Sequence, residues 1–453
     1  MKKIRIILAG MVLSLISTTF ACEAGKHKNE NITVSADSPS FFHAVVAADG
    51  SGNYQIVQAA VDAAPENLKS PWLIFVKNGS YKECVVVPET KPFIYLIGQD
   101  KEKTIIHHNL NVGRKPADDS KKEDMEYWLH SVHNPQSDVY QHEGSVVKVK
   151  ASDFYSENIS YINDWGVNAQ KGPQALAMNS QADRIAFNNC IFRSFQDTWM
   201  TTTNDTHRHY VKDCWIEGAV DYFYGGGDVL AEHCTFYNVR SGSIIVAPCH
   251  KSAKWGYVFR DCIVDGNEAA ADVKKWGVKL GRPWHNSPKA VYIYTTMSIP
   301  ISPEGWTNMG AIPALFAEYD SRDADGNVLN LEKRKTEYEG RGESATKGSC
   351  RAVITAEEAE TYTYENIIIG NDQWNPRLIM EKLPAPKALG KKKQTLKWEA
   401  VDGAIGYIVF DGDKMLGMTC DTSLTLPGYQ VVSLQVCAVN RYGALGVKAT
   451  FLQ

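Results

Sequence analysis

Residues 190–227 read CIFRSFQDTWMTTTNDTHRHYVKDCWIEGAVDYFYGGG and carry one pattern twice. Asp197 follows Cys190 by seven residues, and Asp221 follows Cys214 by the same interval. If the two cysteines occupy equivalent places on successive turns of a coiled chain, the two aspartates do so as well. The stretch therefore predicts a regular coil that carries two carboxylates side by side.

The cysteine segment recurs along the chain, and its repeat length predicts the fold. Each copy has an apolar residue three positions before the cysteine, then two polar residues, the cysteine, and an apolar residue two positions after it. The copies are AFNNCIF (186–192), YVKDCWI (210–216), LAEHCTF (230–236) and VFRDCIV (258–264), with a looser copy, FYSENISY (154–161), that has Asn158 in the cysteine's place. The cysteines lie 24, 20 and 28 residues apart. Strand-like repeats of this length predict a parallel β-helix, whose stacked coils bury the cysteines as an interior ladder.

Two groups of residues raise the alternative of a metal site. Four cysteines bind zinc in many proteins, but spacings of 20 or more residues lack the paired CxxC ligands of such sites. His207 and His209, in THRHY, are further candidate ligands. We interpret the cysteines as core thiols and the two histidines as solvated loop residues.

The N-terminus predicts export. Residues 1–21 combine a basic start, a short apolar run and small residues, which is typical of a secretory signal peptide and too short for a stable membrane span. Cys22 begins a polar tether, residues 22–40, and is a candidate for lipid attachment; simple cleavage into the periplasm is the alternative. We expect an exported protein without a transmembrane span, either periplasmic or an outer-membrane lipoprotein at the cell surface.

The charge of the chain argues against one class of partner. Removal of residues 1–21 moves the formal net charge from −4 to −7, because this segment holds three cations and no anion. A mildly acidic protein is a poor candidate for nucleic-acid binding and has no general attraction for a polyanion. Any anionic substrate must therefore meet local cations.

The rest of the chain is predicted to form two all-β domains. Residues 41–382 hold the repeats and form the predicted β-helix, with a short amphipathic helix over 56–64 and a polar excursion over 111–143. A proline-rich linker lies at 383–386. Residues 383–453 alternate like strands and are predicted to form a small β-sandwich that resembles a fibronectin type III domain and serves as a spacer.

The two aspartates suggest acyl chemistry. Neighbouring coils of a β-helix lie about 4.8 Å apart, so the carboxylates of Asp197 and Asp221 would interact, and the charge of one would raise the pKa of the other. Such a pair supplies one acid and one nucleophile. Gln196 precedes Asp197, and Gln174 lies 22 residues earlier, about one coil away. Two amide donors suit a developing oxyanion, which a glycosidase does not form.

The segment KLGRPW adds a cation and a ring. Arg282 follows the last ladder cysteine by 20 residues and could reach the same face. A guanidinium there would keep one aspartate ionised or bind a substrate carboxylate. Trp284 offers a plane for stacking on a sugar. Taken singly, each of these residues also fits an ordinary turn.

Together these segments give the chain a clear family resemblance. From about Phe42 to Trp374 it resembles the pectinesterase family, the pectin methylesterases among the carbohydrate esterases. The matching pieces, in the family's order, are VAADGSGNYQIVQAAVDAAP, NGSYKE, QALAM, SFQDTWM, GAVDYFYGG and LGRPW. The resemblance implies a right-handed parallel β-helix that acts without a metal or cofactor.

The resemblance also implies roles for individual residues. Asp221 matches the nucleophile and Asp197 the general acid and base, while Gln174 and Gln196 match the glutamines of the oxyanion hole.

The resemblance further implies the substrate-binding residues. Arg282 matches an arginine that orients the nucleophile, and Trp284 matches a tryptophan that holds galacturonate. Phe195 and Tyr222, beside the two aspartates, are the other candidates.

Some positions depart from the family. Asn179 stands where the family usually has arginine, which removes one cation near the groove. Tyr222 and Tyr224 stand where phenylalanines are usual.

The expected activity is hydrolysis of the C6 methyl esters of galacturonan to methanol and free carboxylates, through an aspartyl acyl-enzyme. The expected substrate is methylesterified pectin, and the expected state is a monomer. Two alternatives remain at this point. One is another β-helix enzyme that acts on pectin, a lyase or a polygalacturonase. The other is a non-catalytic glycan-binding protein of the cell surface.

Overall fold

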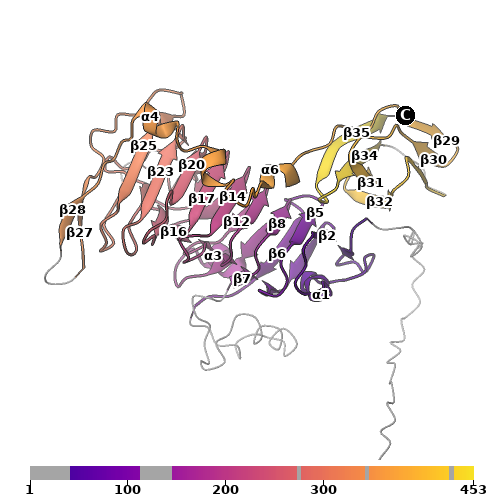
Figure 1. The fold of residues 1–453 in the computed structure, drawn as a ribbon, viewed down its shortest axis with the longest axis horizontal. Helices are drawn as coiled ribbons and strands as arrows, with labels where there is room; N and C mark the ends of the chain where they lie inside the picture. The colour runs from indigo at the N-terminus through magenta and orange to yellow at the C-terminus, as the bar shows by residue number, and fades with distance from the viewer. Residues whose placement is uncertain (1–40, 113–144, 273–276, 342–345, 428–432, 453) are drawn as a thin grey trace, which may run out of the picture. The chain divides into compact units, whose positions relative to one another are not determined.

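The computed structural model describes residues 41–112, 145–272, 277–341, 346–427 and 433–452 (Figure 1). The predicted signal peptide, the tether with Cys22, and nearly all of the excursion at 111–143 lie outside the described residues.

Three parallel sheets of ten, nine and seven strands run through the larger part of the chain, and each complete coil adds one strand to each sheet. Sheet A has the order β1 (Ala44–Val46), β2 (Trp72–Val76), β5 (Ile94–Gly98), β8 (Phe154–Glu157), β11 (Ile185–Asn188), β14 (Arg208–Lys212), β17 (Asp228–Glu232), β20 (Tyr257–Arg260), β23 (Lys289–Ile293) and β25 (Leu315–Tyr319). Sheet B has the order β26 (Arg322–Asp323), β24 (Thr296–Met297), β21 (Ile263–Gly266), β18 (Thr235–Asn238), β15 (Trp215–Gly218), β12 (Ile191–Arg193), β9 (Ser160–Asn163), β6 (Thr104–His108) and β3 (Gly79–Lys82). Sheet C has the order β22 (Lys279–Gly281), β19 (Ile244–Pro248), β16 (Val220–Gly225), β13 (Trp199–Met200), β10 (Leu176–Ser180), β7 (Ser145–Val149) and β4 (Val85–Val87). The predicted parallel β-helix is confirmed.

The cysteine ladder lies inside the coils, as predicted. Its four thiols are at most 2% exposed, and the backbone N–H of Cys190 donates to the Sγ of Cys214 at 3.3 Å. The residue before each ladder cysteine has a positive φ between 51° and 54°: Asn189, Asp213, His233 and Asp261. Asn and Asp tolerate this left-handed conformation better than most residues. Each coil therefore turns a corner between sheets A and B immediately before its cysteine.

The alignment of the looser repeat was wrong by one residue. Asn158 has a φ of 56° and accepts a hydrogen bond from the side chain of Asn189 at 2.7 Å, so it occupies the corner position. Ile159 stands in the cysteine's place, since its carbonyl accepts from the N–H of Ile191. The sequence pattern did not separate a polar corner residue from the core residue that follows it.

A short helix lies at the first coils. We predicted a helix over 56–64, and α1 spans Val57–Asp62. The carboxylate of Glu83 accepts hydrogen bonds from the N–H groups of Val57 and Gln58 at 2.7 and 2.9 Å. A buried carboxylate thus satisfies the open N-terminus of α1.

The outer face of sheet A is covered by the later part of the chain, which forms one apolar cluster with Tyr210 and Leu230 of that sheet. Tyr364 packs edge-on against Tyr210 at 4.9 Å between ring centroids. The short elements of the described chain outside the sheets are α3 (Asp164–Ala169), β27 (Glu337–Glu339), β28 (Lys347–Ser349), α4 (Ala356–Ala359), α5 (Tyr364–Ile367) and α6 (Pro376–Ile379). Sheet A is therefore buried on both faces, whereas sheet C presents polar residues on its outer face.

The C-terminal segment forms two antiparallel sheets with a core of their own around Trp398, Tyr407 and Val409. One sheet holds β29 (Gly390–Lys392), β30 (Thr395–Lys397) and β33 (Ser423–Thr425). The other holds β32 (Lys414–Thr419), β31 (Ala404–Asp411), β34 (Ser433–Asn440) and β35 (Leu445–Leu452). The small β domain is thus present, and its likeness to fibronectin type III stays a prediction. No helix in the described ranges is long and apolar enough to cross a membrane.

Candidate active site

Asp197 and Asp221 lie in adjacent coils on the outer face of sheet C. Gln196 pairs with Val220 as a parallel bridge, and the N–H of Asp197 donates to the carbonyl of Val220 at 2.9 Å. This register places Asp197 directly beside Asp221, one strand spacing of about 4.8 Å away. The equal offsets in the sequence thus correspond to equal positions in the coils.

Both aspartates have an unusual backbone conformation. Their φ angles are 59° for Asp197 and 48° for Asp221, in the left-handed region. The register between β16 and β19 also shifts between Val220 and Phe223. Such strain and irregularity are common where a strand must redirect a functional side chain. The side chains on either side of Asp221 consequently do not follow a regular alternation.

Arg282 distinguishes the two carboxylates. Its Nε and Nη2 donate to the two oxygens of Asp221 at 2.8 and 2.6 Å, which is a two-pronged ion pair. Burial raises the pKa of Asp197 well above its usual range, the charge of Asp221 raises it further, and Arg282 and Gln196 offset only part of this. Burial also raises the pKa of Asp221, but the bonds and charge of Arg282 oppose that effect. The arrangement therefore favours a neutral Asp197 beside an ionised Asp221.

The two glutamines flank this pair in neighbouring coils. The N–H of Ala175 donates to the carbonyl of Gln196 at 3.0 Å, which brings Gln174 next to Gln196. Both side chains are partly exposed. Gly172 approaches so closely that a Cβ at its position would lie 2.8 Å from Oε1 of Gln196. The two glutamines are thus partly exposed residues of neighbouring coils, next to the carboxylates.

Trp284 belongs to an apolar patch on the same face. Its ring meets that of Tyr224 edge-on at 5.6 Å between centroids. Leu176, Ala247, Met200 and Met309 complete the cluster. A partly exposed indole on an apolar support offers a flat surface for the face of a sugar ring.

Two of the predicted binding residues are not available to a ligand. Tyr222 is 0% exposed and lies in the interior core, where its hydroxyl donates to Oδ1 of Asn238 at 3.3 Å. Phe195 is 3% exposed, and the guanidinium carbon of Arg240 lies 5.5 Å from the centroid of its ring. Neither side chain is exposed enough to contact a substrate. The ring that packs against Trp284 is instead that of Tyr224, two residues further along β16.

Arg240 is a second cation near the site that the sequence did not suggest. Burial lowers its pKa, the charge of Arg282 lowers it further, and Asp221 raises it, so all three groups are close enough to interact. It lines a hollow of about 420 Å³ together with Lys279 and Thr307. No motif surrounds Arg240 in the sequence, so only the coil register reveals its position.

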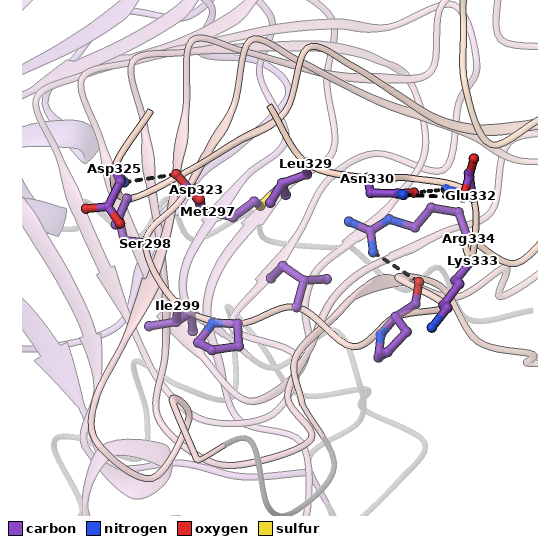
Figure 2. A pocket seen from close by; sticks show the side chains of 14 residues that line it. Met297, Ser298, Ile299, Asp323, Asp325, Leu329, Asn330, Glu332, Lys333 and Arg334 are labelled. Carbon is purple, nitrogen blue, oxygen red and sulfur yellow. Dashed lines mark hydrogen bonds between the residues drawn. The ribbon is translucent and has the colours of Figure 1, made fainter. Parts of the chain in front are cut away.

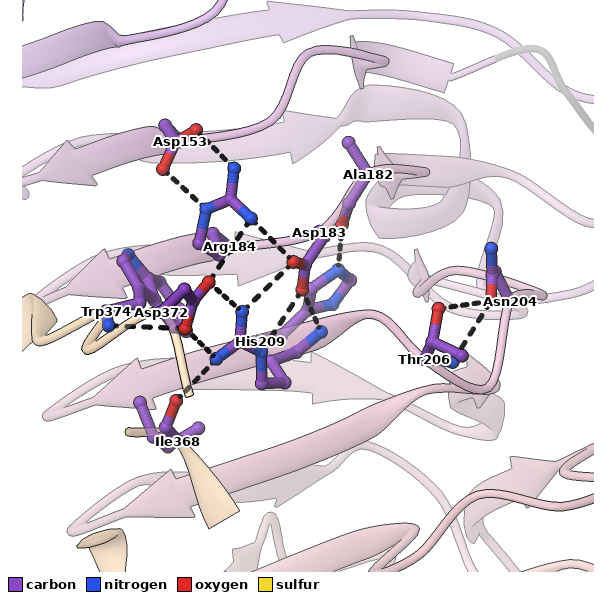
Figure 3. Close-up of polar contacts among 11 residues, drawn as sticks. Asp153, Ala182, Asp183, Arg184, Asn204, Thr206, His209, Ile368, Asp372 and Trp374 are labelled. Atoms are coloured by element: carbon purple, nitrogen blue, oxygen red, sulfur yellow. Dashed lines mark hydrogen bonds and ion pairs between the residues drawn. The ribbon is translucent and has the colours of Figure 1, made fainter. Parts of the chain in front are cut away.

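The histidine prediction was wrong for His209. This residue lies on β14 with 0% exposure, and burial lowers its pKa to about 4. Its Nε2 bonds to the carbonyl of Ala182 at 2.9 Å (Figure 3). His207 instead pairs through Nδ1 with the hydroxyl of Thr202 at 2.8 Å. Among the described residues, no group of three or more His, Cys, Asp or Glu is placed to hold a metal ion.

A cavity of about 540 Å³ lies elsewhere on the chain and contains none of the predicted site residues (Figure 2). Arg334 in its wall donates to Glu318 at 2.6 Å and to the carbonyls of Ser302 and Pro303. Asp323 accepts from the N–H groups of Asp325 and Asn327 in a closed turn. These polar groups are satisfied within the fold, so the site on sheet C remains the better candidate.

Known proteins match this chain over the β-helix. A family model described as Pectinesterase matches residues 43–118 and 129–371. Pectinesterase 31 of Arabidopsis thaliana is 35% identical over 293 residues, which are 60% of this chain and 80% of that protein. A pectinesterase of Petunia integrifolia is 27% identical over 368 residues, 78% of this chain and 84% of that protein.

Solved structures show the same likeness of fold. A pectin methylesterase from carrot has 24% identity and a TM-score of 0.57, covering 73% of this chain and 94% of its own. A pectin methylesterase from Erwinia chrysanthemi has 21% identity and a TM-score of 0.55, covering 73% of this chain and 97% of its own.

Proposed function

The chain belongs to the pectinesterase family of carboxylic ester hydrolases, and we propose that it releases methanol from the C6 methyl esters of galacturonan through an acyl-enzyme on Asp221. The observation that carries the mechanism is the unequal environment of two adjacent aspartates. Arg282 binds Asp221 with two hydrogen bonds, and burial together with the charge of Asp221 keeps the pKa of Asp197 high. One carboxylate is thus ready to attack while the other carries a proton.

In the first half of the reaction, an oxygen of Asp221 attacks the ester carbonyl carbon at C6. The carbonyl oxygen becomes an oxyanion, and the side-chain amides of Gln174 and Gln196 donate hydrogen bonds to it. As the bond to the methoxy group breaks, Asp197 gives its proton to the departing oxygen. Methanol leaves, and Asp221 is joined to the substrate as an acid anhydride.

In the second half, Asp197 is ionised and takes a proton from a water molecule. The resulting hydroxide attacks C6, the bond to Asp221 breaks, and the free uronic acid leaves. Asp197 is again protonated and Asp221 again ionised, so the starting state returns. In each cycle, Asp221 is first ionised and then acylated, whereas Asp197 is first protonated and then ionised.

The apolar patch binds the sugar ring, and the cation beside Asp221 orients the nucleophile. Trp284, supported by Tyr224, contacts the sugar face, while Arg282 fixes the orientation of Asp221. The two glutamine amides beside the carboxylates suit an oxyanion, which develops in ester hydrolysis and not in hydrolysis of a glycosidic bond. This supports ester hydrolysis over cleavage of the polysaccharide backbone.

The location and domain roles are part of the same proposal. The N-terminal residues 1–21 direct export, and the mature protein is periplasmic or attached through a lipid at Cys22. The enzyme acts on methylesterified pectin as a monomer, and residues 383–453 serve as a fibronectin type III-like spacer that follows the β-helix at 41–382 in the chain.

Methanol release from highly methylated pectin, measured together with the chain length of the polymer, tests the reaction. We expect stoichiometric methanol and carboxylate with unchanged chain length, and full activity after treatment with a chelator. Shortened chains without methanol would instead indicate a lyase or polygalacturonase. Binding to pectin without any turnover would indicate a glycan-binding protein.

A further inference from the structure

A second polar hollow lies on the outer face of sheet C and shares Met200 with the apolar patch of Trp284. Its volume is about 450 Å³, and its walls include Lys148, Lys150, Asn179 and Met200. None of the groups that we assign to the chemical step lines it. The hollow therefore requires a separate explanation.

The register of sheet C links this hollow to the active site. Lys148 of β7 pairs with Asn179 of β10, which pairs with Met200 of β13, and Met200 pairs with Tyr224 of β16. Three strand steps of about 4.8 Å each separate the first residue from the last, or about 14 Å. A polymer that lies over Tyr224 and continues along this row enters the hollow.

Asn179 supplies a donor without a partner. The residue is 1% exposed, and its Nδ2 has no hydrogen-bond partner among the described residues. Its Oδ1 accepts from Nε2 of Gln181 at 2.5 Å, which fixes the orientation of the amide. A buried donor that is left unsatisfied is rare and indicates a missing acceptor.

The charged groups of the hollow favour an anion. Lys148 lies on β7, Lys150 directly follows the end of that strand, and both line the hollow. Glu89 contributes one carboxylate to the same walls. Two ammonium groups outnumber it, in a protein whose overall charge is negative.

These donors match a carboxylate better than an ester. An ionised carboxylate has two acceptor oxygens with full charge, whereas a methyl ester is neutral. We propose that Asn179, Lys148 and Lys150 form a subsite that binds the free carboxylate of a galacturonate unit on the same chain as the ester being cleaved. This inference rests on the proposed function, and it makes the enzyme prefer esters that have an unesterified unit nearby.

The preference is measurable as a ratio of kcat/KM values, for partly de-esterified over fully methylesterified oligogalacturonides. We expect Lys150→Gln and Asn179→Asp to lower this ratio by about tenfold each, because each removes or opposes one charge-assisted contact. Lys397→Gln, at an exposed lysine of β30 in the C-terminal sheets, is the matched control and keeps the wild-type ratio. A ratio that is the same in all four proteins would overturn the proposal, as would a wild-type ratio below one.

Direct binding separates the subsite from the reaction. Isothermal titration of unesterified trigalacturonate should show weaker binding to Lys150→Gln and Asn179→Asp than to wild type and Lys397→Gln, with an affinity that falls as salt rises. Equal binding by all four proteins would contradict the subsite. Absence of methanol release by the wild type would contradict the proposed function alone, because the binding comparison does not depend on turnover. Thermal unfolding of each variant identifies any loss caused by misfolding, and Lys150→Gln, at an exposed side chain, provides the test if Asn179→Asp does not fold.

Discussion

Two clusters of aspartate and arginine lie on different sheets of the β-helix, and the pKa of Asp197 in one is raised whereas that of Asp372 in the other is lowered. On sheet C, Asp197 and Asp221 lie beside Arg282, and burial raises the pKa of both carboxyls. Beside sheet A, a cluster that we call the arginine clasp joins Asp153, Asp183 and Asp372 to Arg184 and Arg208 (Figure 3). There, hydrogen bonds from Arg208 lower the pKa of Asp372 to about 2.

The difference lies in how the guanidinium groups are shared. In the clasp, Arg184 binds both oxygens of Asp153 at 2.7 and 2.8 Å, and Arg208 binds both oxygens of Asp372 at 2.8 and 2.7 Å. In the active site, Arg282 directs both of its bonds to Asp221, so Asp197 remains a buried acid next to a charged neighbour. In the clasp, the arginines pair directly with aspartates and so connect segments of the fold. On sheet C, the arginine pairs with Asp221 alone, so Asp197 keeps a proton that a reaction can use.

The largest effect should separate the two clusters by activity. We expect Asp221→Asn to lower methanol release by at least about 1,000-fold, because an amide cannot act as the nucleophile. The matched change Asp183→Asn in the clasp should keep activity within about threefold of wild type. Comparable losses in both variants would mean that Asp221 acts through folding, and similar thermal midpoints for Asp221→Asn and wild type exclude that reading.

Replacing one arginine in each cluster should again affect activity on sheet C but not in the clasp, and the loss of activity should be smaller than that of Asp221→Asn. Arg282→Lys replaces the two-pronged bond by a single point charge, so we expect kcat/KM to fall by about 10- to 100-fold. The acid limb of the pH profile should also move to higher pH, because Asp221 then ionises less readily. Arg208→Lys should leave the profile in place and lower the thermal midpoint by about 2 °C. An unmoved acid limb in Arg282→Lys would contradict the role of Arg282.

The two clusters should contribute to stability with opposite dependence on pH. The pKa of Asp372 is lower in the folded chain, so its contribution is present above the unfolded value of 3.8 and is lost as pH falls towards 2. The pKa of Asp197 is higher in the folded chain, so its contribution is lost as pH rises through the folded pKa. At pH 7 we expect Asp197→Asn to raise the thermal midpoint and Asp372→Asn to lower it slightly. Midpoints that shift in the same direction would rule out this linkage.

The smallest expected effect is on stability, when the hydroxyl of one tyrosine near each cluster is removed. The hydroxyl of Tyr224 is buried without a partner among the described residues, whereas that of Tyr210 donates to Glu232 at 2.5 Å. We expect Tyr224→Phe to keep or slightly raise the thermal midpoint. Tyr210→Phe should cost about 1 kcal/mol, because it leaves a buried carboxylate oxygen with one donor fewer. Equal destabilisation in urea or thermal unfolding would show that the Tyr224 hydroxyl has a partner in solution.

The β-helix and the adjacent positions of Asp197 and Asp221 followed from the sequence for one physical reason. Each coil converts a sequence offset into a spatial register, so Asp197 and Asp221 had to coincide once the cysteines did. The same reasoning found Gln174 and Gln196, whose coils are neighbours.

The predictions from sequence were wrong where the regular geometry of the coils ends. Tyr222 adjoins Asp221 in the sequence, but its ring lies in the interior core, next to a backbone with a positive φ and a shifted register. Asn158 was misaligned by one residue because corner and core positions adjoin. Arg240 reaches the site from a coil with no recognisable motif, and the contacts of the clasp join residues up to 188 positions apart, which no local pattern predicts.

The central claim is that Asp197 is protonated while Asp221 is ionised in the resting enzyme, and infrared difference spectroscopy tests it most directly. Spectra at neutral pH compare wild type with Asp197→Asn and with Asp221→Asn, using the carbonyl stretch of a neutral carboxylic acid as the signal. Burial also raises the pKa of other carboxyls, that of Glu83 to about 7, so the signal is the difference from wild type. We predict that one component of this band is lost in Asp197→Asn and that the same component persists, or shifts, in Asp221→Asn. Loss of the band in Asp221→Asn with its retention in Asp197→Asn would reverse the two roles, and no such band in wild type would contradict the claim.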